Sequence, residues 1–142
     1  INKFVLLLLY MSYKGIYRPS NPKKYKGDQS NIMYRSLWER KFMNYCDLNE
    51  NILEWASEEF WIPYLDPTTN RVRRYFPDFF IKYQDKDNNI RRSVIEVKPM
   101  RETLEPKETK GKSRKTLINE SMTYVKNQAK WKAAREFCAD RK

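Results

Sequence analysis

The chain has 142 residues and carries 29 Lys and Arg against 18 Asp and Glu, a formal net charge of +11. This length fits one domain, and 40% apolar residues are enough for a single core. The sequence contains no histidine, which excludes Ser-His-Asp triads, Cys-His pairs, HExxH zinc sites and nucleases with a histidine base. Any chemistry must therefore use carboxylates, lysines, hydroxyls or a bound metal ion.

The positive charge is concentrated in two segments of the chain. Residues 12–35 hold six basic residues and one acidic residue, and residues 99–142 hold twelve basic residues against six acidic ones. Tyr and Trp are interspersed with these basic residues, as in proteins that bind phosphates and stack bases. We therefore expect DNA or RNA as the partner. A membrane surface is the second choice, and simple solubility is the alternative that needs no partner.

Two features of the sequence bear on the compartment of the protein. The apolar run within residues 1–10 is shorter than the ~20 residues of a transmembrane helix, and it lacks the features of a signal peptide. Because ordinary polar sequence starts at Met11, we expect residues 1–10 to be a non-native upstream extension outside the fold. Cys46 and Cys138 belong to no metal or redox motif, so we expect free thiols in a reducing cytoplasm.

The first half of the chain predicts an arm and a helix. Residues 11–35 mix Gly, Pro, Lys and Tyr without a period, which indicates an extended basic arm. Ser36 and Glu39 have the capping-box spacing that starts a helix, and this helix should end near Asn49. Its predicted apolar face consists of Trp38, Phe42, Tyr45 and Cys46.

The second half predicts three strands and a second helix. Strands are expected at residues 58–64, 71–83 and 90–98, separated by turns at 66–70 and 85–89. Residues 101–114 are polar and predict a mobile loop. A long helix should begin near Ser113, with an apolar face made of Ile118, Met122, Val125, Ala129, Ala133 and Phe137, extended by Leu117, Tyr124, Trp131 and Cys138. The order α-β-β-β-α indicates a mixed α/β domain with an antiparallel meander.

The strongest chemical signal lies in the last two predicted strands. Glu96 and Lys98 share one face of a strand, while their apolar neighbours face the core. A symmetric hairpin centred on Asp87, in the middle of the second turn, places Asp78 opposite Glu96 with Cβ atoms ~4.5–5.5 Å apart. Two carboxylates this close repel each other unless one is protonated or a cation lies between them. The pairing therefore predicts a metal site.

This site suits a hard divalent cation and phosphoryl chemistry. Oxygen ligands from Asp78 and Glu96 match the needs of Mg²⁺, and Lys98 would position the attacking water and neutralise charge on a phosphoryl oxygen. Glu39 could complete the metal shell, although its capping position gives it a structural alternative. A surface ion pair of little consequence is the alternative for the other three residues.

These residues resemble the motif of the PD-(D/E)XK nuclease superfamily, here Pro77-Asp78 followed by Glu96-Val97-Lys98. Longer blocks are similar to the head completion nucleases of T-even-type phages and, in the same order, to TnsA-like transposon endonucleases. The blocks are Tyr34–Glu39, Ser57–Tyr64, Arg74–Phe79 and Lys130–Ala134. The resemblance covers about residues 11–141.

The resemblance implies a restriction-endonuclease-like core over residues 36–142. Related folds continue into another strand after the long helix, so we expect the domain to be truncated and this C-terminal strand to be missing. The implied active site is that of a Mg²⁺-dependent phosphodiester hydrolase, with Mn²⁺ as a substitute. Its residues are Glu39, Asp78, Glu96 and Lys98, of which the first three bind the metal. Glu58 and Gln128 are auxiliary candidates, although Gln128 could equally lie on an ordinary solvated helix face.

The expected function is a DNA endonuclease that processes DNA ends during phage head completion, in the cytoplasm of the infected bacterium and in the virion. The candidate DNA contacts are Lys23, Lys24, Lys26, Arg35, Lys112, Arg114, Lys115 and Lys130. Phage head, portal or neck proteins are further expected partners, no membrane contact is expected, and the oligomeric state is open. Two alternatives remain: a non-catalytic DNA-binding head or neck protein, and a TnsA-like endonuclease of transposition or repair.

Overall fold

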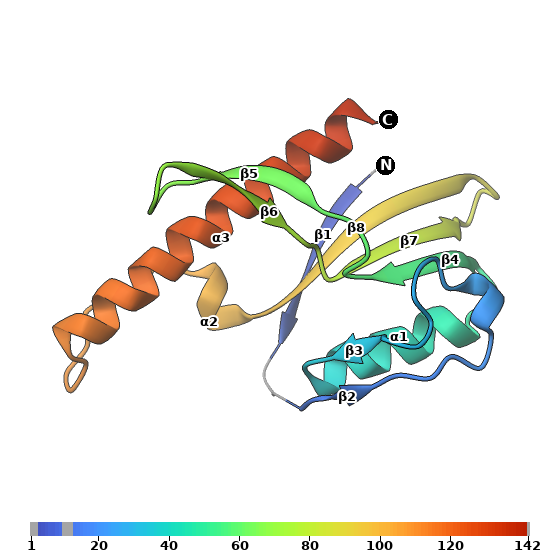
Figure 1. Ribbon diagram of the computed structural model, residues 1–142, viewed down its shortest axis with the longest axis horizontal. Helices are drawn as coiled ribbons and strands as arrows, with labels where there is room; N and C mark the ends of the chain where they lie inside the picture. Colours follow the sequence, from blue (N-terminus) through green and yellow to red (C-terminus); the bar gives the residue numbers. More distant parts are fainter. Residues whose placement is uncertain (1–2, 10–12, 142) are drawn as a thin grey trace.

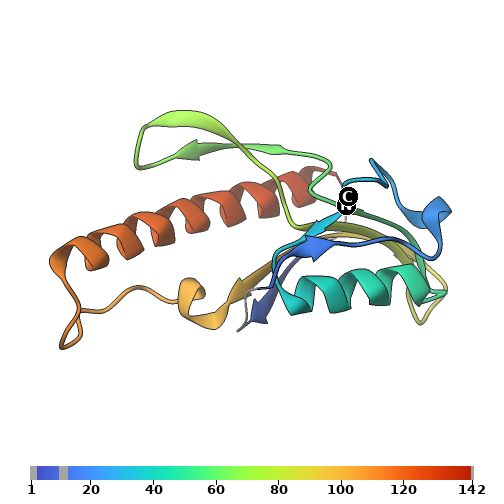
Figure 2. The same ribbon diagram turned by 60° about the horizontal axis from the view of Figure 1, so that its bottom comes forward.

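A four-stranded sheet with the order β1-β8-β7-β4 forms the centre of the fold (Figure 1). The computed structural model describes residues 3–9 and 13–141. The antiparallel strands are β4 (Ile52–Ser57), β7 (Phe79–Gln84) and β8 (Ile90–Pro99), and β1 (Lys3–Leu9) runs parallel to β8. One face of the sheet carries α1 (Leu37–Leu48), and the other carries α3 (Arg114–Asp140) (Figure 2). The mixed α/β class is confirmed, and the arrangement is consistent with a restriction-endonuclease-like fold.

A second, two-stranded sheet interrupts the meander between β4 and β7. It consists of β5 (Ile62–Asp66) and β6 (Arg71–Tyr75), and it packs against α3 rather than joining the central sheet. The prediction of one strand over residues 58–64 and another over 71–83 is therefore wrong in detail. The first omits β4, and the second is broken at Pro77, which has no N–H for a sheet hydrogen bond. Glu58, with φ 54°, turns the chain out of β4 into the hairpin.

The β7–β8 hairpin has the register expected from its sequence. Phe79 pairs with Ile95, and the ladder continues without a shift to the pairing of Gln84 with Ile90. Extending this register by one residue places Asp78 opposite Glu96. The predicted centre at Asp87 is thus confirmed, and the hairpin brings the two carboxylates together at the start of β7.

The first helix begins as predicted but buries a different face. Oγ of Ser36 accepts a hydrogen bond from the backbone N–H of Glu39, which caps the helix, and Asn49 is its C-cap residue. Two residues of the predicted apolar face, Trp38 and Tyr45, are about half exposed, so the prediction is wrong for them. The buried residues are Met43, Cys46 and Asp47, so the face is rotated about the helix axis.

The chain before α1 packs against the core instead of forming a free arm. It contains β2 (Gly15–Ile16), η1 (Pro22–Lys24) and β3 (Met33–Tyr34). Four of its apolar side chains are buried: Tyr17, Tyr25, Ile32 and Tyr34. The predicted basic arm over residues 11–35 is therefore corrected for residues 13–35, while residues 11 and 12 lie outside the described part of the chain.

A fully buried carboxylate ties this segment to α1. Asp47 accepts hydrogen bonds from the Tyr17 hydroxyl at 2.9 Å and from the backbone N–H groups of Ser20 at 2.7 Å and Asn21 at 2.9 Å. A hydrophobicity pattern reads Asp as a solvent-facing residue, so it misses this anchor. The three donors replace the water that the carboxylate loses on burial.

The first strand corrects a further expectation. Residues 1–10 were expected outside the fold, but residues 3–9 form β1, in which Leu6 pairs with Glu96 and Leu8 with Lys98. Phe4 and Leu6 pack on the α3 side of the sheet and Val5 packs on the α1 side. Residues 1, 2 and 10 lie outside the described range. This strand covers the edge of β8, so the expectation is wrong for residues 3–9.

The long helix begins where it was expected, and its buried face is shorter than predicted. Oγ of Ser113 accepts a hydrogen bond from the N–H of Thr116 and caps α3. The buried residues of this helix are Asn127, Trp131, Ala134 and Cys138. Three predicted core residues are instead exposed: Ile118, Met122 and Val125. The reason is that the first half of α3 extends beyond the central sheet (Figure 1). The preceding polar segment, expected as a loop, starts with a short helix α2 (Met100–Thr103).

Two smaller expectations can also be compared with the structure. Cys46 and Cys138 are both buried and unbridged, as predicted. Across residues 3–9 and 13–141, no helix has the length and hydropathy needed to span a bilayer.

A chain that starts at Met11 tests the contribution of β1. Removing it exposes the edge of β8 and the side chains that pack around Phe4 and Leu6, so we expect the thermal midpoint to fall by about 5 °C or more. Circular dichroism of both chains measures this difference. Equal midpoints would show that β1 adds nothing to the stability of the fold.

Asp47→Ala tests the buried anchor. The substitution leaves three donors without their acceptor, each at a cost of about 1–3 kcal/mol, so the free energy of unfolding should fall by about 3 kcal/mol or more. Urea denaturation followed by tryptophan fluorescence gives this value. Asp87→Ala, at an exposed turn position, is the matched control and should stay within about 0.5 kcal/mol of the wild type. A similar loss in both variants would contradict the assignment.

Candidate active site

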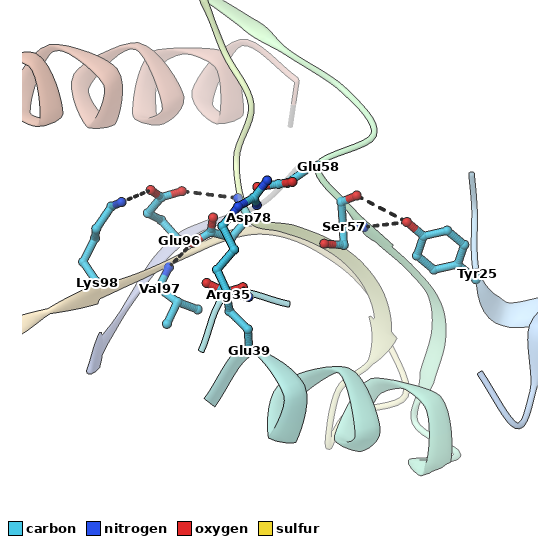
Figure 3. A network of polar contacts seen from close by, with 9 residues as sticks. All are labelled: Tyr25, Arg35, Glu39, Ser57, Glu58, Asp78, Glu96, Val97 and Lys98. Carbon is cyan, nitrogen blue, oxygen red and sulfur yellow. Dashed lines mark hydrogen bonds and ion pairs between the residues drawn. The ribbon is translucent and has the colours of Figure 1, made fainter. Parts of the chain in front are cut away.

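The sequence-predicted acidic residues and the lysine meet in one cleft of about 640 Å³. Asp78 comes directly before β7, Glu96 and Lys98 lie on β8, and Glu39 lies in the first turn of α1. Figure 3 shows their side chains approaching one another from these three elements. The cleft lies where the β5–β6 hairpin leaves the central sheet, and Tyr75 and Arg74 of β6 also line it.

Hydrogen bonds fix Asp78 against Glu96. Oδ2 of Asp78 accepts a hydrogen bond from the backbone N–H of Val97 at 2.7 Å. Oε2 of Glu96 accepts one from the backbone N–H of Asp78 at 3.2 Å and a second from the Tyr75 hydroxyl at 2.7 Å. The Glu96 side chain is buried, as expected for a site enclosed by the β5–β6 hairpin. The two carboxylates are therefore held by backbone as well as side-chain contacts.

Burial and proximity make the ionised forms of this pair costly. Desolvation raises the pKa of Asp78 well above its usual value, and the negative charge of Glu96 raises it further. Desolvation also raises the pKa of Glu96, against the opposing effects of Lys98 and the Tyr75 hydrogen bond. A cation between the two carboxylates would offset the cost of burying their negative charges and would remove their mutual repulsion.

Lys98 provides the positive charge closest to this pair. Its Nζ lies 3.4 Å from Oε1 of Glu96. Burial alone lowers the pKa of Lys98, but Glu96 and Asp78 raise it, and the net result is a pKa above the usual value. The Lys98 side chain therefore stays positively charged at neutral pH, and it can donate hydrogen bonds and stabilise nearby negative charge.

Glu39 both faces the cleft and caps its own helix. Its Oε2 accepts a hydrogen bond at 2.7 Å from the backbone N–H of Arg35, one residue before the position that a standard capping box would use. Desolvation raises the pKa of Glu39, and the negative charge of Glu58 adds to this effect. The structural and site alternatives considered for Glu39 are therefore compatible, since one oxygen caps the helix while the side chain lines the cleft.

Glu58 holds an arginine at the edge of the cleft. Arg35 Nη1 forms an ion pair with Oε1 of Glu58, and Figure 3 shows the arginine reaching from the start of α1 towards it. The backbone N–H of Glu58 also donates to the carbonyl of Asp78 at 3.2 Å. The register of β4 and β7, in which Ser57 pairs with Phe79, places Glu58 opposite Asp78.

The eight predicted DNA contacts divide between the cleft and other regions. Arg35 and Lys130 line the cleft. Lys24 donates to the carbonyls of Asp47 and Asn49 at the end of α1, so its role in this structure is to hold the helix terminus. The other five predicted DNA contacts do not line the cleft: Lys23, Lys26, Lys112, Arg114 and Lys115. The auxiliary candidate Gln128 does not line it either.

Arg74, Tyr75, Phe76 and Arg101 also line the cleft, although the sequence did not predict them as site residues. The first three precede Pro77 directly and lie in the Arg74–Phe79 block of the resemblance. The sequence of β6, Arg71–Tyr75, has no apolar alternation that would mark Tyr75 as inward-facing, and only the observed fold shows that Tyr75 hydrogen-bonds Glu96. Arg101 lies in α2, which the sequence did not predict.

The residues present fit a divalent metal ion held by few protein ligands. Oδ1 of Asp78 accepts no hydrogen bond within the described structure, which leaves it available to a cation. Among residues 3–9 and 13–141, no three Asp, Glu or Cys side chains form a ready-made metal cluster. Mg²⁺ needs no such cluster, because it keeps several waters and commonly binds one or two carboxylates. Asp78 and Glu96 match that requirement, with Glu39 close by.

Asp78→Asn tests the repulsion within the site. The substitution keeps an oxygen that can accept from the N–H of Val97 but removes one of two neighbouring negative charges, so we expect the metal-free thermal midpoint to rise by about 3 °C. Millimolar Mg²⁺ should raise the midpoint of the wild type and leave that of the variant unchanged. A lower midpoint for the metal-free variant would contradict the proposed strain. Asp87→Asn, in the exposed turn, is the control and should behave like the wild type.

The chain is similar in sequence to known nucleases. Residues 49–142 match the family model described as the TnsA-like endonuclease N terminal. The chain is also 37% identical over 134 residues to the head completion nuclease of Enterobacteria phage T4, an alignment that covers 92% of this chain and 87% of that protein. No solved structure gives a significant match. The matched range contains Asp78, Glu96 and Lys98, and the chain belongs to the TnsA-like endonuclease N-terminal family.

Proposed function

We propose that this protein is a Mg²⁺-dependent DNA endonuclease that hydrolyses phosphodiester bonds. The observation that carries the proposal is the placement of Asp78 opposite Glu96, beside Lys98, in a cleft bordered by basic side chains. Family membership supports the nuclease activity, and the net charge of +11 supports a polyanionic substrate.

Each residue of the cleft has a distinct part in this proposal. Asp78 and Glu96 would hold the metal, which when bound supplies Lewis-acid activation of the phosphate and of the attacking water. Glu39 would orient the metal shell from the α1 side. Lys98 would donate to a non-bridging phosphate oxygen and offset the negative charge that grows there during attack. Tyr75 positions Glu96 through its hydroxyl.

The basic residues around the cleft would position the DNA backbone. Arg35, Arg74, Arg101 and Lys130 line its walls. Lys130 lies over two tyrosine rings, with its Nζ 5.7 Å from the Tyr64 ring centre and 5.8 Å from that of Tyr75. Contacts of this kind neutralise phosphates without reading base sequence. Binding should therefore weaken as salt concentration increases.

We infer from the T4 relative that the biological role is the processing of DNA ends during phage head completion. The protein would then act in the infected bacterium, become part of the virion and contact head, portal or neck proteins. Mass spectrometry of purified heads tests this role, and absence of the protein from heads would contradict it. Endonuclease action in transposition or repair would instead use the same cleft without association with heads.

A plasmid nicking assay tests the activity. In the presence of Mg²⁺ the wild type should convert supercoiled DNA to the open-circular form. Asp78→Ala and Lys98→Ala should each reduce the rate by about 100-fold or more, because they remove a metal ligand and a charge-stabilising group.

Matched controls separate the site from general charge effects. Asp87→Ala in the β7–β8 turn and Lys132→Ala on the exposed side of α3 should both retain the wild-type rate. Equal rates in the wild type and in the two site variants would refute the assignment. DNA retention without cleavage under Mg²⁺ or Mn²⁺ would favour a non-catalytic head or neck protein.

A further inference from the structure

The β5–β6 hairpin has two faces of different composition. One face contains Ile62, Tyr64 and Tyr75, which pack against Trp131 and Ala134 of α3. The register pairs Leu65 with Val72 and Pro63 with Arg74 on the opposite face. All four of these residues are exposed. The hairpin therefore presents the apolar side chains of Pro63, Leu65 and Val72 to solvent, and apolar side chains that lie together on a surface can mark an interaction site.

The base of this exposed face differs from its tip. Extending the hairpin register by one residue places Trp61 opposite Phe76, and each side chain is 45% exposed. The Arg74 guanidinium carbon lies 4.8 Å from the centre of the Trp61 ring. We call Trp61, Arg74 and Phe76 the hairpin platform. The tip, in contrast, carries the aliphatic side chains of Leu65 and Val72.

The hairpin platform is continuous with the cleft. Two residues of the platform, Arg74 and Phe76, also line the cleft that holds Asp78 and Glu96. Phe76 lies two residues before Asp78, so their Cα atoms are at most about 7 Å apart. A nucleotide whose phosphate lies at Asp78 can therefore place an adjacent base against the Phe76 ring.

Aromatic rings beside a basic groove bind unpaired bases well. Each base has a flat π-face, and stacking on Phe or Trp needs no particular sequence. Within a duplex, neighbouring base pairs cover both of these faces, so an unpaired nucleotide can use them more readily than a paired one. The arginines and lysines that line the cleft supply the phosphate contacts that such a groove requires.

We propose that the hairpin platform stacks unpaired bases of the strand whose phosphate occupies the cleft. The substrate class is then DNA with unpaired nucleotides next to the bond to be cleaved, such as a tailed or frayed end. This inference rests on the proposed nuclease function and specifies its substrate. The charge around the cleft favours nucleic acid as the occupant, whereas a protein partner would use the aliphatic tip as much as the aromatic base.

Fluorescence anisotropy without divalent metal tests the platform. We compare a blunt duplex with the same duplex carrying a ten-nucleotide tail that contains 2-aminopurine, whose fluorescence decreases when it stacks. The wild type should bind the tailed duplex about tenfold more tightly than the blunt one and quench the probe. Phe76→Leu and Trp61→Leu retain apolar side chains without aromatic rings, and each should remove most of this preference and of the quenching.

Val72→Ser and Leu65→Ser, at the tip of the same exposed face, are the matched controls. Both should keep the wild-type preference for the tailed duplex and its quenching. Equal affinity of Phe76→Leu and the wild type for the tailed duplex would overturn the proposal. A comparable loss in the tip variants would also overturn it, because the surface would then act through apolar area, as expected for a protein partner.

Cleavage in Mg²⁺ distinguishes failure of the platform from failure of the nuclease function. If the wild type cuts blunt and tailed duplexes at equal rates and Phe76→Leu does not alter that ratio, the platform is refuted and the nuclease function stands. If the wild type cuts neither DNA but Phe76→Leu loses tail-specific binding, the nuclease function fails and the platform is supported as a binding site.

Discussion

The candidate active site depends on a close approach of two carboxylates that would separate if they were free. The β7–β8 ladder brings Asp78 to Glu96, and backbone N–H groups of Val97 and Asp78 hold the two side chains in place. Desolvation raises the pKa of both groups, so the fold stabilises an arrangement that is electrostatically unfavourable in the absence of a cation. Sites of this kind are common where a protein binds a metal or performs acid–base chemistry.

The β5–β6 hairpin converts this strand-end pair into an enclosed site. Because the chain leaves the central sheet at Glu58 and returns at Pro77, Tyr75 is carried over Glu96 and buries it. The same excursion places Arg74 and Phe76 on the wall of the cleft. One insertion therefore accounts for the burial of the acidic pair, the positioning of Glu96 and the exposed aromatic surface beside it.

The sequence predicted the parts of the fold that depend on local chemistry. Turn residues around Asp87 set the hairpin register, and the hydroxyls of Ser36 and Ser113 mark the starts of the two long helices. Those signals need only neighbouring residues, and the pairing of Asp78 with Glu96 follows from them. Glu58, an auxiliary candidate in the sequence, lies at the cleft, where it pairs with Arg35.

The remaining features depend on contacts between distant segments. Asp47 looks like a surface residue until three donors from the N-terminal segment surround it. Trp38 has helical apolar spacing yet is exposed, because the rotation of α1 is set by what packs under it. No local pattern shows that β1 pairs with β8 or that Tyr75 reaches Glu96. Tertiary contacts determine these features, and they override local secondary-structure propensity and hydrophobic periodicity.

The central claim is that Asp78 and Glu96 are held together to bind a divalent cation. A crystal of the protein grown with Mn²⁺ and measured at the manganese absorption edge tests it most directly. We predict an anomalous peak between the two carboxylates, at about 2.0–2.2 Å from an oxygen of each, with water completing the shell. An ordered site without manganese at these carboxylates, or manganese bound only elsewhere on the surface, would contradict the claim.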